Sequence, residues 1–169
     1  MNIKKNIALI VGVSIPILMI VLVAAVIYLP RLFYHPAYNF LYATSDDFYA
    51  TQQYDVQDGK LIKKDVRRYG PSTPLEEAKL YIHDVATNQN KEVSFSEAQQ
   101  LNLDPDRQSP DGFEIVTGDH RGDFFPFSFS SDSDYCSRYI SGHNVSRKLD
   151  LKRSSNAYCD GVKFIGWIQ

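Results

Sequence analysis

The sequence predicts an α+β protein: one N-terminal transmembrane helix followed by a mostly antiparallel β domain with one short helix. The first observation is an uncharged apolar run at residues 7–29. The second is a series of short aromatic and β-branched segments separated by turn signals, and the third is a single clear helix-capping signal. The chain has 169 residues. About 140 of them follow the apolar run, which is enough for one domain.

The apolar run is expected to be an uncleaved membrane anchor. Residues 7–29 contain no charge, and about 20 such residues in a helix cross the roughly 30 Å hydrocarbon core. Pro16 lies in mid-span, where membrane helices tolerate proline. A cleaved secretory signal is the alternative, but its apolar region is usually about 7 to 15 residues long. Both interpretations export the domain.

The charges around the anchor predict its direction. Lys4 and Lys5 precede the run, whereas Arg31 alone follows it closely, and basic residues stay on the cytoplasmic side. We therefore expect residues 1–6 in the cytoplasm, 7–29 in the plasma (inner) membrane with the lipid bilayer as partner, 30–37 as a juxtamembrane connector, and 38–169 as an extracytoplasmic β-rich domain.

The charge pattern argues against nucleic acid as a partner. Formal net charge is -2, from 18 basic and 20 acidic residues. Without Lys4 and Lys5 it becomes -4, because 16 basic residues then face 20 acidic ones. Nucleic-acid binding relies on clustered Lys and Arg, and here they occur in scattered pairs such as Lys63-Lys64 and Lys152-Arg153.

The first half of the domain predicts hairpins. Residues 39–43 and 53–57 have strand composition. Asp58-Gly59 follows, and this pair is typical of a type I′ turn, in which both central residues have positive φ. Residues 60–68 are the expected returning strand. A further strand is expected at 79–85 (KLYIHDV), with a turn at 87–90 that predicts a second hairpin.

A capping box predicts the one short helix. Ser94 and Glu97 have the spacing at which each side chain bonds the other residue's backbone N–H, so we expect a helix over 95–101. Strands are then expected at 113–117, 124–129 and 162–168.

The strand at 124–129 carries the candidate interaction surface, Phe124, Phe125, Phe127 and Phe129. Alternation places Phe125, Phe127 and Phe129 on one face. If these rings are buried, they belong to the core. If they are exposed, an aromatic patch of this size marks a contact with protein or membrane.

One stretch resembles a known repeat. LYIHDVATNQ at 80–89, followed by Asp104-Pro105-Asp106 and by SPDGFEIV at 109–116, is similar to one blade of a TolB-like β-propeller. Propellers need about four to eight blades, so the chain is too short to form one. The resemblance implies a shared strand-turn-strand arrangement. The whole chain also looks like bacterial proteins with one N-terminal membrane helix and a small exported domain.

Cys136 and Cys159 are the two cysteines. An even count in an exported chain predicts a disulfide between them. This bridge closes a loop of about 24 residues and stabilises the fold by about 3 kcal/mol in the chain-entropy model. Two buried free thiols, or a pair of metal ligands, are the alternatives. Neither CxxC nor HxxxH occurs, so no metal site and no cofactor are expected.

No catalytic constellation is apparent in the sequence. The four histidines are His35, His83, His120 and His143, and His83 fits a half-buried structural role. Cys136 with His143 is an imaginable nucleophile pair, which a bridged Cys136 rules out. No G-x-S-x-G, S-x-x-K or phosphate-binding glycine loop is present.

These observations predict a membrane-anchored extracytoplasmic binding or assembly module of the cell envelope, with an envelope protein as possible partner. The alternative is a membrane-tethered envelope hydrolase or transferase that uses His143 with a nearby Asp or Ser. A deep pocket lined by His143 and a carboxylate favours this alternative. A subunit of a larger membrane complex is the third interpretation, favoured if Gly12 and Pro16 lie on a packing face of the helix.

Overall fold

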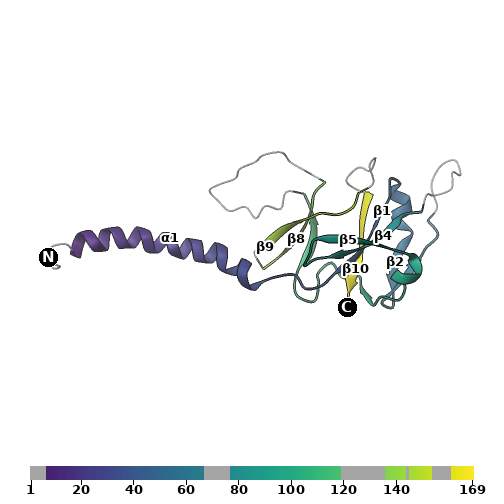
Figure 1. Ribbon diagram of the computed structural model, residues 1–169, viewed down its shortest axis with the longest axis horizontal. Coiled ribbons are helices and arrows are strands. Elements are labelled where there is room, and N and C mark those ends of the chain that lie inside the picture. Colours follow the sequence, from purple (N-terminus) through teal and green to yellow (C-terminus); the bar gives the residue numbers. More distant parts are fainter. Residues whose placement is uncertain (1–6, 67–76, 119–135, 144, 154–160) are drawn as a thin grey trace. The chain divides into compact units, whose positions relative to one another are not determined.

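The computed structural model describes residues 7–66, 77–118, 136–143, 145–153 and 161–169 (Figure 1). The chain divides into two compact units, Met1–His35 and Pro36–Gln169. Each unit is described by itself below. The division falls two residues before the predicted domain start at Tyr38.

The first unit consists of helix α1, Ile7–Phe33. The helix passes through Pro16 and Pro30 and ends at Phe33, four residues beyond the predicted end of the membrane span at Leu29; the connector at 30–37 stays a prediction. Proline removes one backbone donor and crowds the preceding turn, but a long helix can accommodate this with a local bend. Counting only the residues that the structure describes, no helix is both long and apolar enough to cross a membrane.

The second unit is built on a five-stranded antiparallel sheet, in agreement with the predicted mostly antiparallel β domain. Its strand order is β5-β4-β1-β10-β6. The bounds are β1 Phe40–Thr44, β4 Lys79–Asp84, β5 Gln89–Val93, β6 Leu103–Asp104 and β10 Val162–Ile168. The C-terminal strand β10 therefore pairs directly with the first strand of the unit, β1.

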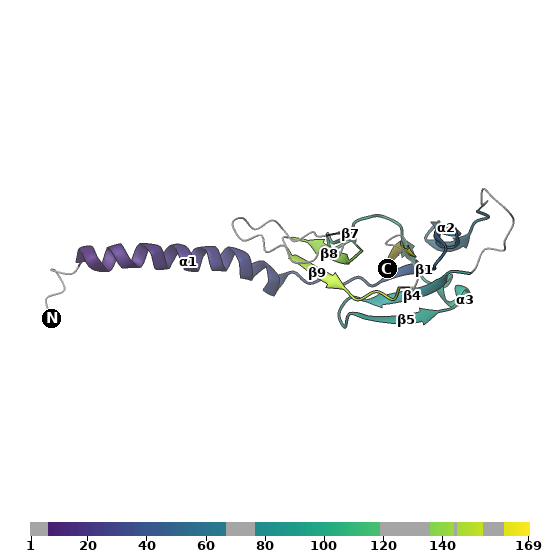
Figure 2. The same cartoon turned by 90° about the horizontal axis from the view of Figure 1, so that it is seen from above.

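Smaller elements cover both faces of this sheet (Figures 1 and 2). The hairpin of β2 (Tyr54–Gln57) and β3 (Lys60–Lys63) contributes to the core on one face, together with helices α2 (Phe48–Gln52) and α3 (Phe95–Ala98). A three-stranded antiparallel sheet contributes to the core on the other face. Its strands are β7 (Glu114–Thr117), β8 (Arg138–Gly142) and β9 (Val145–Leu149).

Strand β1 supplies side chains to both cores. Leu41 and Ala43 belong to the core beneath the β2–β3 hairpin, whereas Phe40 and Tyr42 belong to the core beneath the three-stranded sheet. All four are fully buried. Alternate residues of a strand point to opposite faces, so an apolar run without polar interruption is what a central strand with two covered faces requires.

A β-bulge in β10 adapts the last strand to this arrangement. Leu41 pairs with Gly166 and Tyr42 with Phe164, which leaves Ile165 as the extra residue. The bulge shifts the alternation, so Phe164 and Trp167 lie in the same core although three positions separate them. Both rings contact Phe40, at centroid distances of 5.9 and 5.6 Å.

The local turn and capping predictions are confirmed. Asp58 and Gly59 have φ of 51° and 74°, as the predicted type I′ turn requires. The capping box is present at α3: the Ser94 side chain accepts from the Glu97 N–H, and the Glu97 carboxylate accepts from the Ser94 N–H. The helix ends at Ala98, however, three residues before its predicted end.

Several element bounds differ from the predictions. Strand β3 ends at Lys63 rather than at residue 68, and residues 67–68 lie outside the described part. Helix α2 and strands β6, β8 and β9 were not predicted. The β8 and β9 strands are RYISG and VSRKL, and they lack the regular apolar alternation from which a strand is predicted.

Gly166 offers a direct test of the β10–β6 contact. A Cβ at this position would lie 2.8 Å from the Asp104 carbonyl oxygen and 3.4 Å from the Leu103 Cβ. We expect Gly166→Ala to lower the free energy of unfolding of the second unit by about 1–3 kcal/mol, since the backbone of β6 must shift. Urea denaturation followed by Trp167 fluorescence measures this change.

Gly12→Ala is the matched control, because a Cβ on Gly12 meets nothing within 4 Å. We expect it to leave the unfolding of the second unit within about 0.5 kcal/mol of the wild type. Equal stabilities of Gly166→Ala and Gly12→Ala would contradict the close contact.

Candidate functional site

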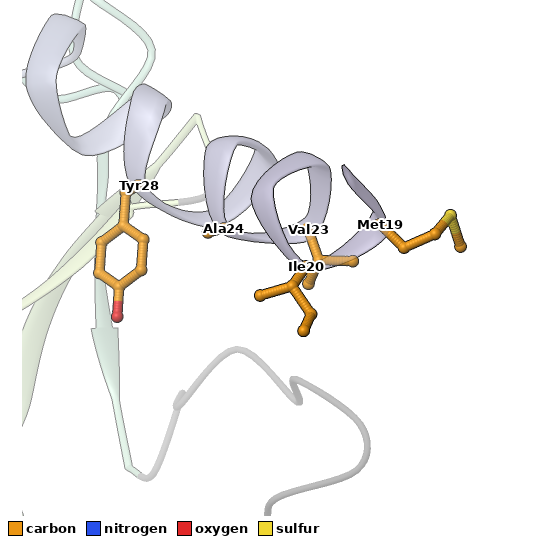
Figure 3. A pocket seen from close by; sticks show the side chains of 5 residues that line it. All are labelled: Met19, Ile20, Val23, Ala24 and Tyr28. Carbon is orange, nitrogen blue, oxygen red and sulfur yellow. The ribbon is translucent and has the colours of Figure 1, made fainter. Parts of the chain in front are cut away.

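Helix α1 carries an open apolar depression on one side. Met19, Ile20, Val23, Ala24 and Tyr28 line it (Figure 3). Ile20, Ala24 and Tyr28 follow one another at four-residue spacing and so share a helix face. The small side chain of Ala24 leaves a hollow between the larger neighbours. Ile20 is 68% exposed, so this face of the helix presents apolar surface.

A buried polar network lies on the face of the five-stranded sheet that the three-stranded sheet covers. His83 on β4 is fully buried, and its Nδ1 lies 2.8 Å from the Asn90 Oδ1 on β5. The Tyr42 hydroxyl on β1 donates to the same oxygen at 3.0 Å. Phe40 packs beside the imidazole, with ring centroids 4.9 Å apart. Residues from three adjacent strands thus meet at Asn90.

This network reaches the segment 147–152, which contains the end of β9 and the residues after it. The Lys152 N–H donates to the Tyr42 hydroxyl oxygen at 2.9 Å, and the Asn90 Nδ2 donates to the Asp150 carbonyl. The Asp150 N–H donates to the Asn88 Oδ1 at 3.2 Å. The Arg147 guanidinium donates to the Val85 carbonyl. These bonds join segment 147–152 to β1 and to the β4–β5 hairpin.

The network defines the tautomer of His83. Asn90 uses its NH₂ group on the Asp150 carbonyl, so its Oδ1 accepts from both Tyr42 and His83. His83 Nδ1 therefore carries the proton, and in the neutral ring Nε2 is an acceptor. Nε2 is buried, and within the described residues it has no hydrogen-bond partner. The Nε of Arg147 is also buried and unpartnered there.

Burial controls the titration of this network. Burial lowers the pKa of His83, with the positive charge of Arg147 acting in the same direction and the hydrogen bond to Asn90 opposing it. Burial also raises the pKa of Tyr42 well above its ordinary value. Both groups are therefore neutral near pH 7, as a buried and largely uncharged network requires.

A small cavity of about 70 Å³ adjoins the network. Its lining includes Phe40, Tyr42, Phe164 and Leu151, with Arg138 as the charged member. The Arg138 guanidinium donates to the Val162 carbonyl at 3.2 Å. Pockets for metabolite-sized ligands are typically about 300–1,000 Å³, so this cavity is a packing gap between the two sheets rather than a ligand pocket.

His143 lies beside a serine and an aspartate, but the hydrogen bonds are those of a turn. The His143 Nε2 lies 2.8 Å from the Asp111 carbonyl oxygen. Ser109 is 4% exposed, and its hydroxyl lies 2.5 Å from the Asp111 carboxylate and accepts from the Phe113 N–H. The buried hydroxyl is engaged by Asp111 and Phe113. This geometry is that of a stabilised Ser-Pro-Asp-Gly turn and does not present an accessible nucleophile with its base.

The remaining predicted site residues lie partly outside the described chain. Cys136 is half-buried and disulfide-bonded. Cys159 lies outside the described residues, so its pairing with Cys136 stays a prediction. Phe124, Phe125, Phe127 and Phe129 also lie outside them. Where side chains are described, no group of three or more His, Cys, Asp or Glu residues could hold a metal ion.

Sequence reasoning identified His83 but not the network around it. It predicted a half-buried histidine, whereas the ring is fully buried. Tyr42 and His83 both belong to predicted strands, and a pairing of those strands in register would have placed them on one face. Asn90 was expected in a turn and Arg147 was not singled out, because their roles depend on contacts between distant strands.

No family model, curated protein or solved structure matches the chain. The resemblance of residues 80–116 to a TolB-like blade stays a sequence resemblance. Strands β4 and β5 lie in the five-stranded sheet and β7 in the three-stranded sheet, whereas a propeller blade places successive strands in a single sheet.

Tyr42→Phe tests the energetic importance of the network. The substitution removes the hydroxyl between the Lys152 N–H and the Asn90 Oδ1 and leaves both short of a partner. We expect the free energy of unfolding to fall by about 1–3 kcal/mol, as measured by urea denaturation.

Tyr81→Phe provides the control. The Tyr81 hydroxyl donates to the exposed Glu92 at 3.0 Å, so water can replace its partner and the change should stay within about 0.5 kcal/mol. If both variants are equally stable, the buried network does not contribute as we describe.

Proposed function

We propose that this chain is a membrane-anchored extracytoplasmic binding or assembly module of the cell envelope. Its N-terminus lies in the cytoplasm and the second unit lies outside the plasma (inner) membrane. The observation that carries the proposal is the absence of any charge in residues 7–29. A run of this length is typical of a bilayer-spanning segment.

The exposure of the side chains on α1 supports an apolar environment for the helix. Val13, Leu18 and Val26 are 55%, 65% and 64% exposed and lie on different sides of the helix. Water-exposed helices in globular proteins present a polar face, whereas a helix that is apolar on all sides is buried in protein or lipid. The side chains described on α1 lack such a polar face from Val11 to Val26.

Two features support an outward-facing second unit. Lys4 and Lys5 precede the apolar run, which favours retention of the N-terminus in the cytoplasm. Cys136 is disulfide-bonded, and disulfides persist in oxidising compartments such as the space outside the plasma membrane. Both features favour the same orientation.

A binding or assembly role agrees with the described chemistry better than catalysis does. The Ser109 hydroxyl is engaged in a turn, and the Asn90 side chain and the Tyr42 hydroxyl are engaged with segment 147–152. A hydrolase or transferase is the alternative, and it requires a pocket lined by His143 and a carboxylate. Neither the depression on α1 nor the cavity beside Tyr42 is lined by His143. An envelope protein is the partner class that an anchored module of this kind would meet.

A double substitution in α1 tests the anchor. Near the centre of a span each Arg costs about 2.5–3.5 kcal/mol, whereas each Ile, Leu or Val contributes about 0.3–0.6 kcal/mol to insertion. We expect Ile20→Arg with Val23→Arg to release the protein from membranes during alkaline carbonate extraction, while the wild type stays in the membrane pellet.

The matched control adds two arginines to the second unit. Gln57 and Gln89 are exposed there, so Gln57→Arg with Gln89→Arg should stay in the pellet like the wild type. A wild-type protein that is extracted by carbonate, or a Ile20→Arg, Val23→Arg variant that resists extraction, would refute the anchor.

A further inference from the structure

Segment 147–152 is joined to β8 by the antiparallel pairing of residues 147–149, and to β1 and the β4–β5 hairpin by polar contacts. Leu149 and Leu151 enter the core between the sheets, but the backbone on either side of them is held by side chains of β1, β4–β5 and the turn between β4 and β5. The bonds from Lys152 to Tyr42, from Asp150 to Asn88 and from Asn90 to Asp150 span 60 or more residues of sequence. The bond to the Asp150 carbonyl depends on the orientation of the Asn90 side chain, whose Oδ1 also accepts from Tyr42.

His83 holds Asn90 in that position. The Asn90 Oδ1 receives the His83 Nδ1–H and the Tyr42 O–H, which orients its NH₂ group toward the Asp150 carbonyl. The neutral imidazole fits this site, because Nδ1–H donates to Asn90 and the unprotonated Nε2 does not have to donate to an acceptor. Within the described residues His83 Nε2 has no hydrogen-bond partner, and the nearby Asn88 side chain, which favours the charged ring, already accepts from the Asp150 N–H.

The charges around His83 oppose a positive ring. Arg147 on β9 is the nearby cation, and Asp84 on β4 is the nearby anion whose attraction is weaker. The Asp84 carboxylate is itself engaged by the Ala86 and Thr87 N–H groups. The other titratable groups of β1, β4, β5 and segment 147–152 are Tyr42, Lys79, Tyr81, Lys91, Glu92, Lys148, Asp150 and Lys152.

We propose that His83 is an acid-sensitive latch: its neutral ring holds segment 147–152 against the β4–β5 hairpin, and its protonation releases this segment while the rest of the sheet stays folded. A second proton on Nε2 creates a buried cation beside Arg147, at a ring nitrogen that has no hydrogen-bond partner within the described residues. Movement of segment 147–152 carries Arg147 away and admits water to the ring. The 70 Å³ cavity between Tyr42 and Leu151 shows that the two sheets are not tightly packed there, which lowers the cost of this local opening.

The direction of the pH dependence follows from proton binding. The released state binds the proton with an ordinary histidine pKa of about 6.5, whereas burial lowers the pKa of His83 in the latched state. The latch is therefore fully stable above about pH 6.5 and weakens as the pH falls below that value toward the lower pKa. For one proton, the equilibrium constant for opening rises by at most about tenfold per pH unit.

Amide hydrogen exchange of the full-length protein in detergent micelles tests the latch. The N–H groups of Asp150 and Lys152 report on it directly, and those of Leu41 and Ala43 report on the central sheet. Between about pH 7.5 and pH 5, after correction for the intrinsic exchange rate, we expect protection of Asp150 and Lys152 to fall by up to about tenfold per pH unit. Protection of Leu41 and Ala43 should stay constant.

Two variants separate His83 from other titrating groups. His83→Leu replaces the imidazole by an apolar side chain of similar size that cannot titrate. In this variant the protection of the Asp150 and Lys152 N–H groups from exchange should not depend on pH. His143→Gln removes an exposed histidine that lies in the β8–β9 turn, and it should retain the wild-type profile. If His83→Leu does not fold, imidazole ¹⁵N shifts of the wild type replace it: Nδ1–H at neutral pH, with Nε2 protonation coinciding with loss of Lys152 protection.

Three results would overturn the proposal. The first is constant Asp150 and Lys152 protection in the wild type across this pH range. The second is a parallel loss of protection at Leu41 and Ala43, which shows that acid unfolds the whole unit. The third is loss of the pH dependence in His143→Gln, or wild-type pH dependence in His83→Leu.

Discussion

The second unit depends on one strand that must be buried on both faces. The residues of β1, FLYAT, are 0–5% exposed, so two separate layers have to cover the five-stranded sheet. Apolar burial contributes about 25 cal/mol per Å². The large rings of Phe40 and Tyr42 therefore strongly favour a layer that covers their face of the sheet. The β2–β3 hairpin with α2 and α3 covers one face, and the β7–β8–β9 sheet covers the other.

The two layers that pack on the five-stranded sheet contact it in different ways. The core beneath the hairpin is formed largely by aliphatic side chains and by Tyr54, whose hydroxyl donates to the Ala78 carbonyl. The core beneath the three-stranded sheet is aromatic and adjoins the network of His83, Asn90 and Tyr42. Buried hydrogen bonds of this kind fix the position of the groups that they join, and losing one partner costs about 1–3 kcal/mol. This second interface is therefore the one that a single proton can affect.

The sequence was sufficient where structure is determined locally. The Asp58-Gly59 turn, the Ser94–Glu97 capping box and the bounds of β10 agree with the predictions because each depends on neighbouring residues alone. The bulge at Ile165, strands β8 and β9, and the bonds of Asn90 and Arg147 depend on the register between strands that are far apart in sequence. Composition and spacing do not specify that register. The predicted surface at Phe124–Phe129 lies outside the described residues and stays a prediction.

Thiol accessibility distinguishes an exported, disulfide-bridged domain on a membrane anchor from a domain in the cytoplasm. Intact cells, lysed cells and denatured samples are treated with a membrane-impermeant thiol reagent, with and without reductant, for the wild type, Cys136→Ser and Cys159→Ser. For an exported, bridged domain we expect that the wild-type thiols react only after reduction and that each single variant exposes one reactive thiol. Reaction of both wild-type thiols in lysed, unreduced cells but not in intact cells would place the domain in the cytoplasm and contradict the account.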